Sequence, residues 1–174
     1  LNMYWMHEMV NTASQLREKM AFFWHWHFAC RNLNVFYQQG LLDVIRRNAL
    51  GNFGTMLKEV SKSAAMLNFL NNQQNRKDHP NENFAREVME LFTLGRGNYS
   101  ENDVKEAARA FTGWGANIKG EFQFRRFQHD FGSKTVIGRT GSLDGGEVLD
   151  ILLEETQTAK YITQKIYKFF VNEK

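Results

Sequence analysis

The stretch from Pro80 to Trp114 constrains the fold more than any other part of the sequence. It reads PNENFAREVMELFTLGRGNYSENDVKEAARAFTGW, in which two segments carry the 3.6-residue periodicity of amphipathic helices. Gly95 and Gly97 lie between these segments and supply positions that tolerate positive φ. We therefore predict two helices joined by a tight glycine turn, around which the rest of the chain is organised.

The first predicted helix runs from Glu82 to Leu94. Its apolar stripe, at i, i+4 and i+7, consists of Phe84, Val88 and Leu91. The opposite side carries polar side chains, namely Arg86, Glu90 and Thr93, with Glu87 at the border. We expect the stripe to be buried, and we expect the polar residues of the opposite side not to be ordinary surface residues.

The second predicted helix begins at Ser100. Ser100 and Asp103 have the spacing of a capping box, with Asp in place of the usual Glu or Gln. The buried stripe that follows contains small residues that let a neighbouring helix approach closely: Val104, Ala107, Ala108 and Phe111. Arg109 lies on the other side of this helix, so it belongs with the polar residues of the first one.

Arg86, Glu87, Glu90 and Arg109 form the strongest candidate cluster, to which His27 is added if its helix packs nearby. Carboxylates and guanidiniums alternating at helical spacing indicate an ion-pair network that fixes the helix geometry. The alternatives are a metal or acid–base site built on Glu87, Glu90 and His27, or plain surface charge. We favour the structural network.

His27 falls on the apolar stripe of an expected helix that begins near Ser14, whereas His25 points nearly the opposite way. Histidines at i and i+2 on a helix cannot bind one ion, unlike the i, i+4 pair of metalloproteases. We therefore expect His27 to be a core histidine bonded to a carboxylate or a carbonyl, with a ligand or proton-transfer role as the alternative. Glu87 and Glu90 alone are a weak metal signal, because no Glu-x-x-His motif accompanies them. The sequence requires no cofactor.

Further binding candidates are aromatic, basic or imidazole side chains: Trp24, Trp26, Arg86, Arg109, Trp114 and His129. Asp130, which follows His129, either orients that histidine or serves as a turn residue, and the turn role is favoured. Residues 71–83 are the most polar run, NNQQNRKDHPNEN. We expect a solvated loop there, and the alternative is a loop whose amides organise a site.

The predicted fold class is mainly α, a multi-helix orthogonal bundle with one small β-hairpin at about residues 121–138. Helices are expected at 40–50 and, as one amphipathic helix, from Phe53 over about 18 residues. The alternating run EFQFRRFQHDF and the β-prone run KTVIG supply the two strands of the hairpin. We expect residues 1–174 to form a single helical domain. Because the chain begins at Leu1, we expect it to be a fragment excised from a longer protein.

The runs FFWHWHFA and NENFAREVMELFTLGRGNYSENDVKEAARAFTGW resemble the bacterial domain-of-unknown-function family eighteen hundred (DUF1800), from about residue 16 to the C-terminus. The resemblance implies no activity. It implies by association a periplasmic or extracellular setting and a companion protein similar to sulfatases and alkaline phosphatases.

Composition and charge bear on three further features: nucleic-acid binding, membrane spans and disulfides. The net charge of +3 comes from scattered basic pairs and not from a stripe, which argues against nucleic-acid binding. No stretch reaches the roughly 20 apolar residues of a membrane span, and the mean hydropathy is −0.51. The one cysteine, Cys30, excludes an internal disulfide and is expected to be a buried hydrophobe.

Three hypotheses follow from these observations. In the first, the chain is a non-catalytic helical module that binds a partner through aromatic surface. In the second, it is an enzyme, for example a hydrolase, centred on Glu87, Glu90 and His27. In the third, it is a purely structural segment. Neither a Gly-x-Ser-x-Gly motif nor a Walker lysine is present. We favour a structural or binding role, and solvent access to the polar candidates separates the hypotheses.

Overall fold

The computed structural model describes residues 2–172, which fold into a mainly α structure, as predicted. The elements before the glycine turn are α1 (Asn2–Asn11), α2 (Gln15–His27), α3 (Val35–Asn48), α4 (Phe53–Ser61), α5 (Ala64–Phe69), η1 (Asn72–Gln74), α6 (Asn83–Glu87) and η2 (Val88–Thr93). Those after it are α7 (Glu101–Ala110), β1 (Trp114–Ala116), β2 (Phe122–Phe124), η3 (Arg126–Gln128), β3 (Lys134–Val136), β4 (Arg139–Gly141), α8 (Gly145–Glu154) and α9 (Thr156–Phe170).

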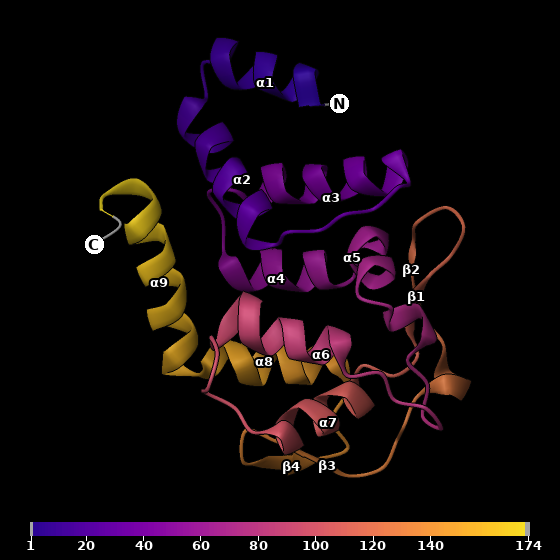
Figure 1. Cartoon of the computed structure of the whole chain (residues 1–174). Coiled ribbons are helices and arrows are strands. Elements are labelled where there is room, and N and C mark those ends of the chain that lie inside the picture. Colours follow the sequence, from indigo (N-terminus) through magenta and orange to yellow (C-terminus); the bar gives the residue numbers. More distant parts are fainter. Residues whose placement is uncertain (1, 173–174) are drawn as a thin grey trace.

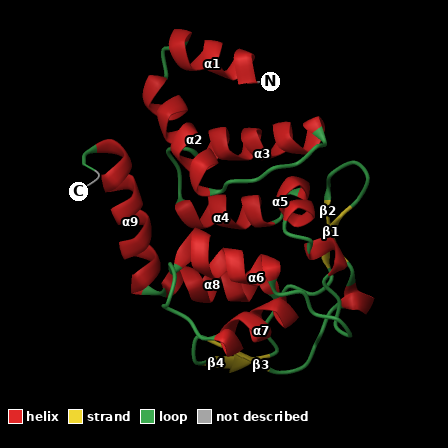
Figure 2. Ribbon diagram, viewed as in Figure 1, coloured by secondary structure: helices red, strands yellow, loops and turns green. Residues whose placement is uncertain are grey.

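The helices form stacked layers. In Figure 1, α3, α4 and α6 lie one below another, while α9 crosses one end of the stack at a steep angle. Figure 2 shows α1 beyond α2 at one end, the β3–β4 hairpin below α7 at the opposite end, and the β1–β2 hairpin at the side next to α5. The core between the layers is rich in aromatic and aliphatic side chains that water does not reach, including Phe23, Phe28, Met56, Leu57, Phe84 and Phe111.

The central helix pair begins and ends as predicted, but its first helix changes pitch. Residues 88–93 form a π-helical turn, in which the Leu94 N–H donates to the Met89 carbonyl at 2.8 Å. The Thr93 hydroxyl donates to the Val88 carbonyl at 2.7 Å and satisfies an acceptor inside this wider turn. The wider turn rotates the following side chains, so Leu91 is 43% exposed and Thr93 is buried. The prediction that Leu91 lies on the buried stripe was therefore wrong.

Local signals elsewhere decide where helices begin. The predicted capping box of Ser100 and Asp103 is present, and Gly95 has a φ of +79° at the end of the first helix. The helix expected over about 18 residues from Phe53 is instead two helices, because Ser63 accepts a bond from the Met66 N–H and caps a new helix. The helix expected from Gly40 begins earlier, at Val35, where Asn34 is the cap.

The β structure consists of two separate hairpins in the described part of the chain. Strand β2 pairs antiparallel with β1, with Trp114 opposite Phe124, and β3 pairs with β4, with Val136 opposite Arg139. The pairing of the 121–131 and 134–138 runs with each other was wrong, because each run has a nearer partner across its own tight turn. In residues 2–172, no helix combines the length and the apolar character that crossing a membrane needs.

Candidate functional site

His27 lies at the end of α2 and is only 3% exposed. Its Nε2 atom lies 3.2 Å from the Phe92 carbonyl, which accepts hydrogen bonds only, so Nε2 carries the proton. The other ring nitrogen, Nδ1, lies 3.1 Å from the Lys165 ammonium and accepts from it. Burial first, and the Lys165 charge second, lower the pKa of His27 to about 3. The imidazole is therefore neutral at physiological pH.

Lys165 extends from α9 across the π-helical turn. Its Nζ atom also reaches the Leu91 carbonyl at 3.4 Å and lies 4.7 Å from the ring centroid of Tyr161 and 5.3 Å from that of Trp26. Burial lowers the pKa of Lys165. This lysine holds α9 against the C-terminal end of α2 and against η2 without a carboxylate partner in the described residues.

Glu90 is half-buried on η2 and accepts a short hydrogen bond, 2.5 Å, from the Tyr99 hydroxyl. Burial and this bond raise the pKa of Tyr99 to about 12. Glu87 is one turn earlier, and burial, followed by repulsion from Glu90, raises its pKa. The two carboxylates therefore interact electrostatically, and the hydrogen bond from Tyr99 holds the Glu90 side chain in place.

Arg86 belongs to a separate ion-pair group at the start of the central helix. Its guanidinium bonds the two carboxylate oxygens of Glu101 at 2.8 and 2.7 Å and the Glu82 carboxylate at 3.1 Å. The Glu101 bonds, with help from Glu82, raise the pKa of Arg86. Because the Arg86 side chain is 34% exposed and that of Glu101 is 71% exposed, these ion pairs add little to stability.

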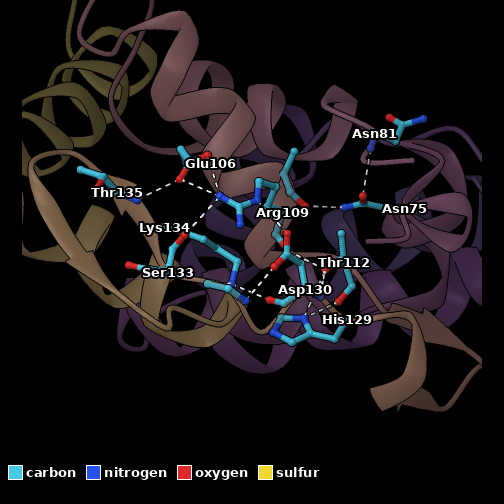
Figure 3. A network of polar contacts seen from close by, with 12 residues as sticks. Asn75, Asn81, Glu106, Arg109, Thr112, His129, Asp130, Ser133, Lys134 and Thr135 are labelled. Carbon is cyan, nitrogen blue, oxygen red and sulfur yellow. Dashed lines mark hydrogen bonds and ion pairs between the residues drawn. The ribbon is translucent and has the colours of Figure 1, made fainter. Parts of the chain in front are cut away.

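Arg109 forms a different group on the other side of α7 (Figure 3). Its Nε donates to the Asp130 carboxylate at 2.7 Å, and its Nη1 donates to both oxygens of Glu106 at 2.9 and 3.0 Å and to the Ser133 carbonyl at 3.2 Å. The bond to Asp130, followed by that to Glu106, raises the pKa of Arg109. Arg109 therefore ties α7 to the loop that precedes β3.

The predicted cluster is thus divided among three places. Arg86 pairs at one end of the first helix, Arg109 pairs with the loop before β3, and Glu90 bonds Tyr99. His27 contacts the end of the same π-helical turn, but its hydrogen-bond partners are Phe92 and Lys165, not Glu87 or Glu90. Among residues 2–172, no three His, Cys, Asp or Glu side chains come close enough together to hold a metal ion.

A buried polar network fills the region where a solvated loop was expected. Asn72 and Asn75, 0% and 1% exposed, bond each other and the carbonyls of the 108–114 segment, the Asn75 amide reaching the Ala108 carbonyl at 2.9 Å. The Asn75 side-chain oxygen accepts from the Asn81 N–H at 2.9 Å (Figure 3). The prediction of a solvated loop was wrong for these two residues, because their side-chain amides supply hydrogen bonds to backbone groups that lack a backbone partner.

His129 is part of the same network. It is 3% exposed, and its Nδ1 donates to the Thr112 carbonyl at 2.8 Å (Figure 3). Asp130 does not orient this histidine: its carboxylate bonds Arg109 and accepts from the Gly132 N–H at 2.8 Å, as a turn residue does. Lys134, 1% exposed, donates to the carbonyls of Asp130 and Gly132.

The three tryptophan candidates differ in access. Trp24 and Trp114 are each 4% exposed, and the Trp24 indole donates to the Ala49 carbonyl at 3.0 Å. Trp26 is 57% exposed, one turn from Phe22 on the same face of α2, and Phe22 is 47% exposed. Phe22 lines a hollow of about 550 Å³ between α1, α2 and α9, and Trp26 lies one turn further along the same face of α2. We call this hollow the aromatic groove; its lining residues are Met9, Val10, Gln15, Glu18, Lys19, Phe22 and Phe169.

Sequence reasoning missed several residues that organise these sites. Lys165, Asn72, Asn75 and Lys134 were not among the predicted site residues. The one available signal was the density of Asn in residues 71–83, since Asn side chains satisfy irregular backbone.

The comparisons with known proteins agree with the resemblance in the sequence. The family model described as "Protein of unknown function (DUF1800)" matches residues 1–174, the whole chain. No curated protein and no solved structure matches at a significant level.

Proposed function

The chain belongs to the DUF1800 family, and we propose that it works as a helical binding module that holds a protein partner in the aromatic groove. The partner chemistry that fits is an amphipathic helix, because the groove lies between helices and is lined by apolar side chains together with Gln15, Glu18 and Lys19. The single observation that carries the proposal is the exposed pair Phe22 and Trp26, at 47% and 57%, on the side of α2 that borders this hollow.

The shape of the groove supports a helical partner. Gln15, Lys19, Phe22 and Trp26 follow one another at helical spacing along one face of α2. That face is about 16 Å long at 1.5 Å per residue, which accommodates three turns of a second helix. Phe169 of α9 lies against Phe22, with 6.4 Å between the ring centroids, and closes the other side.

The state of the polar candidates supports binding over catalysis. An acid–base enzyme centred on Glu87, Glu90 and His27 needs at least two of these groups open to one pocket. His27 is sealed, and its pKa of about 3 makes the imidazole too weak a base to take a proton near neutral pH. Neither Glu87, Glu90 nor His27 lines the aromatic groove.

The candidate partner is the companion protein similar to sulfatases and alkaline phosphatases that the family resemblance implies, in a periplasmic or extracellular bacterial setting. An anchor of two exposed rings is the type of contact that dominates protein interfaces. We expect the companion to place the apolar face of a helix in the aromatic groove, along α2.

The test is calorimetric titration of this protein with the purified companion, comparing wild type with Phe22→Asp and Trp26→Asp. Each variant is expected to weaken binding at least about tenfold, as loss of an interface anchor does. The matched control is Phe127→Asp, since Phe127 is 92% exposed on η3, outside the groove. Equal affinity for all four proteins, or no binding by wild type, overturns the proposal.

A second measurement addresses the enzyme directly. Hydrolysis of ester and phosphate-ester substrates is compared between wild type and Glu90→Gln, with circular dichroism to verify the fold. A turnover that Glu90→Gln removes without unfolding the protein supports the acid–base alternative instead.

A further inference from the structure

A second hollow lies beside α3 and shares no lining residue with the aromatic groove. It measures about 330 Å³ and is enclosed by α3, by the junction of α4 and α5, and by the turn of the β1–β2 hairpin. Its apolar wall is formed by four α3 side chains, Phe36, Tyr37, Leu41 and Val44. We call this hollow the α3 pocket. Its volume is at the lower end of the range for small-molecule sites.

The polar side of the α3 pocket carries excess positive charge. Its charged lining residues are Arg47, Glu59, Lys62 and Lys119. Arg47 and Glu59 neutralise each other through an ion pair of 2.7 Å. Neither lysine takes part in an ion pair within residues 2–172. Two cations without carboxylate partners in the described residues therefore belong to the lining of this hollow.

The two lysines come from elements that the fold holds in place. The Lys62 ammonium lies 5.3 Å from the ring centroid of Phe122 and 5.5 Å from that of Trp114, both in the β1–β2 hairpin. Lys119 is in the hairpin turn, next to Ile118, whose carbonyl accepts from the Tyr37 hydroxyl at 3.0 Å. This bond attaches the turn to α3, so that Lys119 stays beside the pocket.

Gly40 is a glycine that packing within the chain does not explain. It lies in the interior of α3, where glycine is less favourable than alanine. A Cβ at Gly40 would meet no atom within 4 Å, so nothing in the chain excludes a side chain there. Gly40 does line the α3 pocket. The position thus gives up helix stability and leaves open the space that a side chain would fill.

From these observations we propose that the α3 pocket binds a small amphiphilic anion, with an apolar chain against the α3 wall and a carboxylate head between Lys62 and Lys119. The apolar wall supplies burial, and the two lysines supply charge-assisted hydrogen bonds to the head group. A neutral ligand of the same shape gains only the burial. A cationic one meets repulsion from both lysines.

The experiment is isothermal titration of the full chain with octanoate, octanol and octylamine at low ionic strength. Octanoate is expected to bind at least about tenfold more tightly than octanol, since each charge-assisted contact contributes on this scale. Octylamine is expected not to bind. Equal affinity for octanoate and octanol overturns the proposal, as does the absence of octanoate binding.

Two sets of variants locate the binding. Lys62→Gln and Lys119→Gln are each expected to weaken octanoate binding about fivefold to tenfold and to leave octanol binding unchanged. The matched control for loss of a positive charge is Lys105→Gln, an exposed lysine of α7 outside the pocket. Unchanged octanoate affinity in both pocket variants contradicts the assignment.

Gly40→Leu tests the pocket without removing a charge. The leucine is expected to abolish octanoate binding while the midpoint of thermal unfolding stays equal or rises, because helix propensity improves. Asn102→Leu places the same side chain on an exposed position of α7 outside the pocket, also without removing a charge, and serves as the control. Should Gly40→Leu fail to fold, Gly40→Ala adds one methyl group and is expected to weaken binding several-fold. Wild-type affinity in the folded Gly40 variants refutes the proposed location.

Discussion

The Nδ1 atom of His27 lies 3.1 Å from the Nζ atom of Lys165, and the two residues are 138 positions apart in the sequence. The Phe92 carbonyl determines that His27 presents a lone pair to the lysine. The contact joins the end of α2 to α9 across the π-helical turn η2. It makes the histidine a neutral acceptor inside the core.

The buried state of His27 predicts loss of stability in acid. Its pKa falls from 6.5 to about 3 on folding, so the unfolded chain binds more protons between these values. The stabilisation is fully present above pH 6.5 and is lost as the pH falls to about 3. The loss from this one residue amounts to roughly 5 kcal/mol.

Urea denaturation across this pH range measures the effect. His27→Gln keeps a donor for the Phe92 carbonyl and is expected to show a much flatter dependence on pH. His79→Gln, at an exposed position, is expected to behave like wild type. A variant of His27 with the same acid sensitivity as wild type contradicts this account.

Because Arg86 and Arg109 belong to separate ion-pair groups, substituting them is predicted to have independent effects on stability. Arg86 and Arg109 bond different carboxylates and share none. The changes in unfolding free energy caused by Arg86→Ala and Arg109→Ala should therefore add within about 0.5 kcal/mol in the double variant. A coupling energy above about 1 kcal/mol would show one connected network. Chemical denaturation of the four proteins provides the cycle.

Removing the buried side-chain amide of Asn75 is predicted to lower the free energy of unfolding more than removing an exposed amide does. Asn75→Ala leaves the Asn72 side-chain oxygen, the Ala108 carbonyl and the Asn81 N–H without their partner. We expect destabilisation of about 2–4 kcal/mol, because buried polar groups left unpaired carry their desolvation cost. Gln123→Ala, at an exposed position of β2, is the control and should change stability by less than about 0.5 kcal/mol. Similar losses of stability in both variants would contradict the role of Asn75 as a buried hydrogen-bond partner.

The single cysteine is predicted to be unreactive. Burial raises the pKa of Cys30 to about 12. At pH 8 its thiolate fraction is then about a thousandfold below that of an ordinary thiol, and the thiolate is the reacting species. Colour development with Ellman's reagent should be slow in the native protein and fast in urea. Rapid reaction of the native protein would show that the thiol is not held in its buried site.

The central helix pair shows how far local patterns reach. The Val104, Ala107, Ala108 and Phe111 stripe is fully buried, the capping box at Ser100 is formed, and Gly95 takes a positive φ as predicted. These features depend on residues within a few positions of one another. The 3.6-residue pattern failed at the π-helical turn, where it placed Leu91 on the buried stripe. The pattern does not predict the bond between the Thr93 hydroxyl and the Val88 carbonyl that accompanies this wider turn.

The amino-acid sequence by itself determined the helical class, the glycine turn, the helix caps and the family, since each follows from propensity, spacing or a motif over a short stretch. Only the tertiary structure decided which partner each polar side chain takes: Lys165 for His27, Asp130 for Arg109 and Ala108 for Asn75. These partners are 138, 21 and 33 positions away, and an acid or amide on a helix does not specify which distant group will meet it. The packing of the helices brings those groups together, and it is the desolvation cost of leaving them unpaired that makes the choice.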